Sequence, residues 1–525
     1  MTTEFVRELD KKLLNLTPKD SFTVRDSFNG VHVFGAIGSG KTSGTGRLLS
    51  GAYLRAGYGG LVLCAKPEEV ELWISYCKQH GREKSIILFD RNRHFNFLQY
   101  EFSRKGADAA NSVTDILMKI LKVADMAAGQ GQGREGEAIW IKTTRECLLN
   151  TVTVLFSATG TVRIESIVEF ILSMPTAPPS TEEEKKRQVN NYALDRLTRC
   201  RKNPVHRLPE HTLKRVRNYF FKQFIATPEK MRGSVIASVC AELNRFSDGI
   251  LREQFCTTTD LVPEFVFSGG VIIMAFPVLS FNEEGLVAQA LFKQIFQRAV
   301  ESRNGLASEF HERPIFLWAD ESHLFCSETD DLFLSTCRGS KCAVVYLSQS
   351  LPTYYAQLGN QQENRVDGFI GKFGSQIFHT NADPRSNKYA SSLIGRGLHI
   401  RRSWDESTGT SRDRSTNANS NSGVNYSGGD SEGDQGKGSN SGSGRNSGSG
   451  YGRSTSEGSS HTLSNGTSEQ IDDLVESNFF AQHLKSGGEP YGFEVTALWL
   501  KAGANFKQPM PGASNNVILA TFKQR

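Results

Sequence analysis

Residues 31–49, VHVFGAIGSGKTSGTGRLL, constrain the fold of this chain more than any other stretch. Gly35 is followed, after four residues, by Gly40, Lys41 and Thr42, with an apolar run before the loop and a helix-compatible run after it. This is the spacing of a phosphate-binding P-loop, whose glycines let backbone amides curl around an anion at the start of a helix. A glycine-rich turn between a strand and a helix is the alternative interpretation. The motif predicts a strand, a nucleotide-binding loop and a helix in that order.

The predicted P-loop implies which cofactors the protein binds. Lys41 would neutralise the β and γ phosphates of ATP, and the Thr42 hydroxyl would ligate Mg²⁺. We therefore expect ATP and Mg²⁺ as cofactors of an ATPase. The candidate nucleotide-binding residues are Gly35, Ala36, Ile37, Gly38, Ser39, Gly40, Lys41, Thr42 and Ser43.

A second motif, IFLWADES at residues 315–322, supplies the carboxylates that a P-loop needs. An apolar strand runs directly into Asp320 and Glu321, which places both side chains at the strand's carboxyl end, where ligands of open α/β sheets bind. Asp320 would share the metal with Thr42, and Glu321 would polarise the attacking water. An apolar run followed by two acids also occurs by chance, so this prediction depends on the P-loop upstream.

Two further polar residues flank the apolar strand CAVVYLSQS at residues 342–350. Gln349 stands near its end, where a side-chain amide could sense the γ-phosphate or align water, or could simply cap a strand end. Arg338 lies just before the strand. It could reach the γ-phosphate of a neighbouring subunit as an arginine finger, or be a solvated surface charge.

The order of expected elements predicts an α/β fold with a mainly parallel sheet. Strand-like and helix-like segments alternate over the first hundred residues, helical periodicity dominates about 107–262, and apolar strands return from 269. The predicted parts are 1–106 and 263–404 for the nucleotide-binding domain, 107–262 for a helical insertion with an all-alpha domain, 405–470 for a loop, and 471–525 for a C-terminal return to the nucleotide-binding domain.

Residues 405–470 consist almost entirely of Ser, Gly, Asn and charged residues. Such a segment has too little apolar surface to offset the entropy of ordering, so we predict a disordered loop. Both a tolerated surface insertion and a regulatory or partner-binding loop remain open. The sequence after it, including YGFEVTALWL, predicts a late strand that joins the sheet.

Charge and cysteine content exclude few functions. Sixty-one Lys and Arg against 56 Asp and Glu give a net charge of +5, which neither requires nor excludes nucleic acid. Nine scattered cysteines without a CxxC pair indicate neither a disulfide framework nor a zinc site, and favour a reducing cytoplasm. The most apolar stretch, 147–172, is interrupted by Asn150, Arg163 and Glu165, so no membrane span is expected.

The segment KRVRNYFFKQF at residues 214–224 is basic with interleaved aromatic residues. This composition makes it a candidate contact for nucleic acid. An amphipathic core helix is the interpretation that the pattern favours.

Taken together, these motifs resemble the type IV secretion coupling proteins of bacterial conjugation, within the FtsK and HerA class of ring-forming ATPases. Three further stretches contribute to the resemblance. They are FNFLQY (95–100), similar to the family's Asn-containing turn before the helical domain; ASVCAELNRFSDGILREQF (237–255), similar to its helical return to the sheet; and KFGSQIFHTNADPRSNKYASSLIGRG (372–397), similar to its late strand, Asp turn and helix.

The resemblance implies a RecA-like P-loop ATPase that assembles as a homo-hexamer and pumps DNA, or hands a DNA–protein substrate to a secretion channel. Relaxase or channel proteins would be its partners. It also implies that Gly35–Ser43 bind the nucleotide, Asp320 the Mg²⁺ and Glu321 the water, while Arg338 reaches the neighbour's phosphate and Gln349 couples hydrolysis to motion. The inserted all-alpha domain would select substrates at one mouth of the ring.

The chain departs from the family pattern at two places. Many relatives carry membrane-spanning helices before the P-loop, whereas about 34 polar residues precede it here. We expect a cytoplasmic location, with peripheral attachment to the inner membrane as the alternative. Relatives also show Asp before the Lys that follows the next strand, but Ala65 precedes Lys66.

The sequence leaves three functions open. The first is an ATP-driven DNA translocase of the coupling-protein type. The second is an ATP-dependent protein-binding switch, favoured by the weak net charge and the missing anchor. The third is a nucleic-acid clamp in a mobile-element or defence system, without translocation.

Overall fold

The computed structural model describes residues 4–127, 137–177, 181–183, 190–358, 363–417, 431–433, 436–438 and 452–524. These residues fall into two compact units: Met1–Leu393 with Glu476–Arg525, and Ile394–Val475. All nine cysteines are free thiols.

A mainly parallel sheet of nine strands forms the core of the larger unit, in the order β15-β14-β9-β3-β8-β7-β4-β6-β5. Neighbouring strands from β9 to β5 are parallel, whereas β14 pairs antiparallel with both β9 and β15. The predicted α/β fold is confirmed, and the expected late strand is β14. The bounds are β3 Val31–Phe34, β4 Gly59–Leu63, β5 Ile86–Phe89, β6 Val271–Met274, β7 Ile315–Ala319, β8 Cys342–Ser348, β9 Ser375–Phe378, β14 Glu494–Lys501 and β15 Val517–Lys523.

Burial explains why the central strands are apolar without alternation. Every residue of β3, β4, β6, β7, β8 and β9 is buried, as expected when helices cover both faces of a parallel sheet. The elements around the sheet are β1 Lys12–Asn15, β2 Ser21–Thr23, α1 Val24–Ser27, η1 Lys41–Gly46, α2 Arg47–Arg55, α3 Pro67–Gln79, η2 Glu83–Ser85, η5 Pro263–Ser268, α13 Val278–Ser302, η6 Arg303–Gly305, α14 Ser308–His311, η7 Ser322–Leu324, α15 Glu328–Thr336, α16 Leu351–Leu358, α17 Glu363–Ile370, α18 Pro384–Ile394, α19 Phe479–Gln482 and η8 Glu489–Tyr491.

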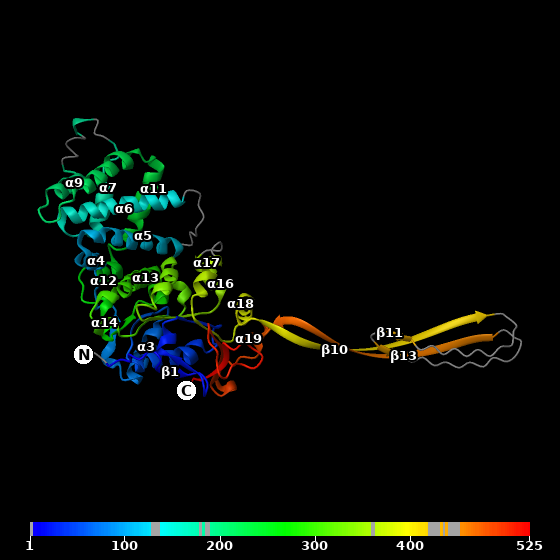
Figure 1. Ribbon diagram of the computed structural model, residues 1–525. Helices are drawn as coiled ribbons and strands as arrows, with labels where there is room; N and C mark the ends of the chain where they lie inside the picture. The colour runs from blue at the N-terminus through cyan, green and yellow to red at the C-terminus, as the bar shows by residue number, and fades with distance from the viewer. Residues whose placement is uncertain are drawn as a thin grey trace. The chain divides into compact units, whose positions relative to one another are not determined.

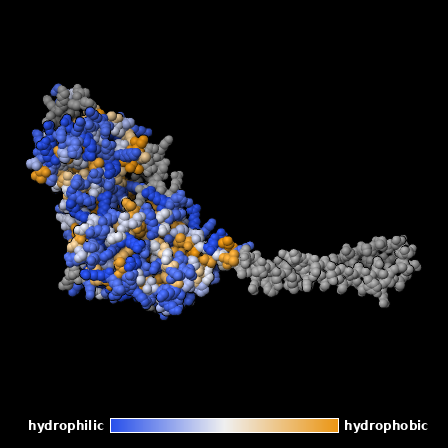
Figure 2. Space-filling model, viewed as in Figure 1, coloured by the Kyte–Doolittle hydropathy of each residue, from blue (hydrophilic) through white to orange (hydrophobic). Residues whose placement is uncertain are grey.

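A helical region leaves the sheet after β5 and returns before β6. In Figure 1, α6, α7, α9 and α11 lie at one end of the unit, and α5 lies between them and α13. Figure 2 shows a mostly hydrophilic surface over these helices. The bounds are α4 Phe97–Lys105, η3 Gly106–Asp108, α5 Ala109–Ala127, α6 Glu137–Thr159, α7 Ile164–Ser173, α9 Tyr192–Lys202, α10 Glu210–Asn218, η4 Tyr219–Phe224, α11 Glu229–Asn244 and α12 Gly249–Phe255.

Asn96 ties the exit of the helical region to its return. Its side-chain oxygen accepts a hydrogen bond from the Gln99 amide at 3.0 Å and so caps α4, while its side-chain nitrogen donates to the carbonyls of Cys256 and Thr257, both at 3.1 Å. Helical structure thus begins at Phe97, ten residues before the predicted boundary at 107. The domain boundaries themselves stay a prediction.

Within the described part of the chain, no single helix has the length and apolar character needed to cross a membrane. The pair Ala138–Thr159 and Ile164–Ser173 meets that requirement only jointly, and the two helices are bent by 111°.

The smaller unit consists of antiparallel strands. β10 (Arg396–Asn417) pairs with β13 (Gly452–Asp473), and β11 (Ser431–Gly433) pairs with β12 (Gly436–Gly438). Parts of β10 and β13 lie within residues 405–470, which the sequence predicts as a loop with little apolar surface. The rest of the predicted loop, residues 418–430, 434–435 and 439–451, lies outside the described residues.

A buried ion pair joins α13 to α15. Lys293 and Asp330 are 0% and 1% exposed, and the Lys293 ammonium lies 2.5 Å from an Asp330 carboxylate oxygen. Gln297 and Tyr346 donate to the other oxygen at 2.6 and 3.0 Å. Burial raises the pKa of Asp330, but the charge of Lys293 outweighs it and holds this pKa below its ordinary value.

Lys293→Met is expected to reduce the free energy of unfolding by about 3–5 kcal/mol, because it leaves the Asp330 carboxylate buried without its counter-charge. Lys372→Met is the matched control. Lys372 pairs with the adjacent Asp331 where the two side chains are 34% and 40% exposed, so its loss should cost about 0–1 kcal/mol. Urea denaturation of both variants measures the difference. If the two variants lost the same free energy of unfolding, the buried Lys293–Asp330 pair would contribute no more than the exposed Lys372–Asp331 pair, and the prediction would be wrong.

Candidate functional site

The predicted P-loop follows β3 and leads into α2. Gly38 and Gly40 have φ values of 75° and 80°, a left-handed conformation that favours glycine. The last residue of β8 and the segment after β9 hold the loop's first residues, since the Gly35 amide donates to the Ser348 carbonyl and the Ala36 amide to the Thr380 carbonyl. A Cβ on Gly40 would lie 2.5 Å from a methyl of Val495 in β14. The loop therefore needs glycine for its backbone and for close packing.

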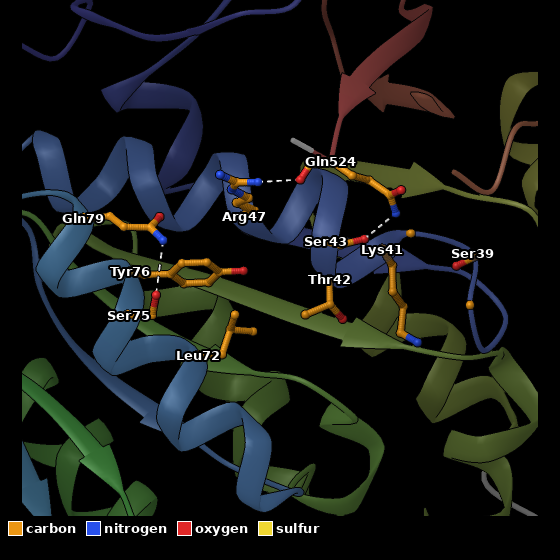
Figure 3. Close-up of a pocket in the computed structure, with 12 residues that line it drawn as sticks. Ser39, Lys41, Thr42, Ser43, Arg47, Leu72, Ser75, Tyr76, Gln79 and Gln524 are labelled. Atoms are coloured by element: carbon orange, nitrogen blue, oxygen red, sulfur yellow. Dashed lines mark hydrogen bonds between the residues drawn. The ribbon is translucent and has the colours of Figure 1, made fainter. Parts of the chain in front are cut away.

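A cavity of about 530 Å³ opens beside this loop, a size in the range that small-molecule ligands occupy. In Figure 3, Lys41 and Thr42 point from the loop to one side, and the Tyr76 ring extends from α3 toward them. The predicted loop residues that line the cavity are Gly38, Ser39, Gly40, Lys41, Thr42 and Ser43, and the others are Arg47, Leu72, Ser75, Tyr76, Gln79 and Gln524.

The C-terminus of the chain closes one side of the cavity. The Gln524 side-chain amide donates to the Ser43 hydroxyl at 2.7 Å, and its backbone carbonyl accepts a hydrogen bond from Arg47 at 2.5 Å (Figure 3). The sequence motifs predict neither Arg47 nor Gln524 as a residue of this site. Only the folding of β15 beside β14 brings residue 524 to the P-loop, and no local motif encodes that contact.

Asp320 lies directly beside the P-loop threonine. The Thr42 hydroxyl donates to a carboxylate oxygen of Asp320 at 2.7 Å, across 278 residues of sequence. A second oxygen of Asp320 accepts a hydrogen bond from the Glu321 amide at 2.9 Å. Hydroxyl and carboxylate oxygens are ligands that Mg²⁺ prefers, and Mg²⁺ usually takes only one or two carboxylates, with waters and phosphates completing its shell. Thr42 and Asp320 therefore fit a nucleotide-bound Mg²⁺.

Glu321 lies next to Asp320 at the end of β7. Its φ of 48° is left-handed, a conformation that costs a non-glycine residue roughly 1–3 kcal/mol and clusters at functional sites. Lys66 donates to one carboxylate oxygen at 3.0 Å, and the Gln349 side-chain amide lies 3.2 Å from both oxygens. The side chain is only 5% exposed.

Nearby positive charges keep Glu321 ionised. Burial raises the pKa of this carboxyl, but the charges of Lys41 and Lys66 and the hydrogen bonds from Lys66 and Gln349 outweigh burial, so the pKa lies below its ordinary value. An ionised carboxylate in this position can accept a proton from water or polarise it.

Gln349 connects two strand ends. Its side chain contacts Glu321, while its backbone carbonyl accepts a hydrogen bond from the Asn381 side chain at 2.9 Å. The predicted role of Gln349 at the γ-phosphate or the attacking water stays a proposal.

Besides Arg47, two more charged residues of the site, Lys66 and Glu69, were not predicted. Lys66 was noted only as part of a departure from the family pattern, yet it is the ion-pair partner of Glu321. Glu69, in the first turn of α3, accepts hydrogen bonds from the Ala65 and Lys66 amides, and burial together with the charge of Asp320 raises its pKa to about 8. A charged cluster directly after a buried strand, as in AKPEE, is the signal that could have found both.

Arg338 does not join this site within one chain. It is exposed and precedes the amino end of β8, whereas Gln349 follows the carboxyl end. Seven strand residues separate the two ends, which corresponds to roughly 20 Å. Among the described residues, the Arg338 side chain has no ion-pair partner. Its predicted role at a neighbour's nucleotide therefore stays a proposal.

Comparisons with known proteins place the fold. No protein-family model matches the sequence, and no curated protein matches it. Among solved structures, the unbound monoclinic form of the bacterial conjugative coupling protein TrwBdeltaN70 aligns with a TM-score of 0.53 and 13% identity, over 96% of this chain and 87% of that chain.

Two other solved structures show weaker likeness. The plasmid coupling protein TrwB in complex with ADP and Mg²⁺ aligns with a TM-score of 0.45 and 14% identity, over 75% of this chain and 79% of that chain. VirB4 of Thermoanaerobacter pseudethanolicus aligns with a TM-score of 0.41 and 12% identity, over 70% and 80%. The coupling-protein resemblance is confirmed at the level of the fold: this chain has the α/β P-loop fold of a bacterial conjugative coupling protein.

Proposed function

We propose that this protein is an ATP-hydrolysing DNA translocase that delivers DNA or DNA–protein substrates to a type IV secretion system. The observation that carries the proposal is the convergence of Thr42, Asp320 and Glu321 at one edge of the sheet, with Thr42 hydrogen-bonded to Asp320 at 2.7 Å. A P-loop, a metal-binding carboxylate and a water-polarising carboxylate are the parts that ATP hydrolysis requires.

Each residue of the site then has a role in hydrolysis. Lys41 binds the β and γ phosphates from the cavity, and Thr42 with Asp320 holds Mg²⁺. When bound, Mg²⁺ neutralises charge that develops on the phosphate oxygens. Glu321 orients the attacking water and accepts its proton, while Lys66 holds the Glu321 carboxylate in place. Gln349 transmits changes at Glu321 to the segment after β9.

We further propose a homo-hexameric ring in which Arg338 contacts the nucleotide of the neighbouring subunit. Its distance from its own P-loop supports this role, because a finger residue acts across an interface. Closed rings are the usual assembly when identical subunits share head-to-tail sites. Relaxase or secretion-channel proteins would be its partners, in the cytoplasm or at the inner membrane.

The rate of ATP hydrolysis with and without DNA tests this function. We expect single-stranded or duplex DNA to raise turnover of the full chain several-fold at low salt. The stimulation should fall steeply between about 50 and 200 mM salt, because phosphate contacts release counterions. A rate of ATP hydrolysis that does not change when DNA is added at low salt would instead favour the ATP-dependent protein-binding switch.

Lys66→Met is expected to shift the acidic limb of the kcat profile to higher pH. The substitution removes a positive charge and a hydrogen bond that lower the Glu321 pKa, so this pKa should rise and the carboxylate should protonate at higher pH. Lys78→Met, at an exposed position of α3, is the control and should leave the profile unchanged. An unshifted acidic limb in Lys66→Met would contradict the role of this ion pair.

A further inference from the structure

The helix α10 and the π-helical turn η4 expose one face to solvent. From the sequence alone, an amphipathic core helix is the favoured interpretation of residues 214–224. Leu213, Val216, Tyr219, Phe220 and Phe224 do point inward and are buried, with at most 5% exposed. Residues between them are solvent-accessible, and five of these line a hollow of about 250 Å³. We call the outward residues the basic–aromatic face; they are Lys214, Arg217, Asn218, Phe221 and Lys222.

Positive charge is concentrated in this part of the chain. Residues 192–232 contain eleven Lys and Arg against three Asp and Glu, a net charge of +8, whereas the full chain carries +5. The remainder of the molecule is therefore net negative. The small net charge of the full chain is thus an average that includes one strongly basic segment. The charge of a local patch determines polyanion binding more than the net charge of the whole protein does.

The cations of the face are uncompensated. Elsewhere in the segment, Arg199 pairs with Asp195, and Arg232 donates to three backbone carbonyls. Among the described residues, Lys214, Arg217 and Lys222 have no ion-pair or hydrogen-bond partner for their side chains. Of the described residues that line the hollow, Glu210 alone is a carboxylate. These three side chains are free to bind phosphate.

An aromatic ring stands among these cations. Phe221 is 45% exposed, while its neighbour Phe220 is 1% exposed and packs edge-to-face against Phe170. The π-helical turn Tyr219–Phe224 carries Phe221 and Lys222 at the edge of the hollow. Single π-helical turns inside helices are frequent at functional sites. An exposed ring beside cations is the arrangement that stacks an unpaired base while the cations bind the backbone.

We propose that the basic–aromatic face binds single-stranded nucleic acid, with Phe221 stacking on a base and Lys214, Arg217 and Lys222 contacting phosphates. This inference deepens the proposed function and rests on it, because it names the element through which the helical region would hold the DNA substrate. Duplex DNA fits less well, since its bases are stacked on one another and offer Phe221 no free face.

Fluorescence anisotropy of a labelled oligothymidine with the full chain tests the proposal. Phe221→Ala should weaken binding of the oligonucleotide by roughly 5- to 150-fold and leave duplex binding nearly unchanged. The triple variant Lys214→Gln, Arg217→Gln and Lys222→Gln should weaken binding further. It should also make the slope of log affinity against log salt shallower by about 2, because each lost phosphate contact contributes about 0.7.

A matched control variant removes three positive charges outside the basic–aromatic face. Lys11→Gln, Lys12→Gln and Lys19→Gln change three exposed cations near the N-terminus and should preserve both affinity and slope. Basal ATP turnover without DNA should remain unchanged in every variant, and DNA-stimulated turnover should fall only in the variants of the face. Unchanged basal turnover also shows that the variants fold.

The outcomes separate this inference from the proposed function. If the wild-type chain binds DNA and is stimulated by it, and the face variants retain both properties, the inference is wrong and the proposed function stands. If the variants lose binding to vesicles with anionic headgroups or to an acidic peptide but keep oligothymidine binding, the face serves another partner and the inference is also wrong. If the wild-type chain neither binds DNA nor responds to it, both fail.

Discussion

Glu321→Gln is expected to lower the rate of ATP hydrolysis by about 10²- to 10⁴-fold while ATP still binds. The substitution keeps the shape of the side chain but removes the charge that accepts a proton from water. Lys66 loses its carboxylate partner, whereas the amide can still contact Gln349. Thr42 and Asp320 are untouched, so the proposed Mg²⁺ site should persist. Steady-state turnover and equilibrium binding of a fluorescent ATP analogue measure the two properties separately.

The matched control for this variant is Glu309→Gln, which makes the same chemical change at an exposed position of α14. It should retain wild-type turnover. A Glu321→Gln variant that hydrolyses ATP within threefold of wild type would show that another group polarises the water, and the assignment of this residue would be wrong.

Lys41→Ala is expected to reduce kcat/KM for ATP by at least about 10²-fold, because it removes the side chain that binds the β and γ phosphates. Lys41 is only 7% exposed and lines the cavity beside the loop. Unlike Glu321→Gln, this variant should also bind the ATP analogue more weakly. Lys12→Ala, an exposed lysine, is the control. Normal ATP affinity in Lys41→Ala would contradict the P-loop assignment.

Mixing this variant with Arg338→Ala tests the proposed ring. Each variant alone should be inactive, since one lacks the phosphate-binding lysine and the other lacks the neighbour's finger. In a mixed ring, a Lys41→Ala subunit still offers Arg338 to an intact P-loop next to it, so turnover should return in part. Absence of any rescue in verified mixed assemblies would mean that Arg338 does not act between subunits.

The parts of the site that sequence predicts are those encoded over a few residues. The P-loop and the Asp320–Glu321 pair each need only a short run with the right flanking strand, and parallel strands place their carboxyl ends at one edge of the sheet. Their mutual contact, Thr42 to Asp320 across 278 residues, follows from that rule.

The contacts that sequence missed depend on pairing between distant segments. Gln524 reaches Ser43 only because β15 pairs with β14, and β14 packs against Gly40. Lys66 meets Glu321 because β4 lies beside β7, a neighbour relation that no local pattern reports. Composition predicts how little apolar surface residues 405–470 can bury, and it carries no information on the pairing of β10 with β13.

ATP-driven displacement of streptavidin from end-biotinylated DNA by the wild-type chain tests translocation most directly, with Glu321→Gln as the inactive reference. We expect streptavidin to leave the DNA only when wild-type protein, Mg²⁺ and ATP are all present, and no displacement with Glu321→Gln. DNA-stimulated ATP hydrolysis by the wild-type chain without any displacement would contradict translocation and identify a nucleic-acid clamp instead.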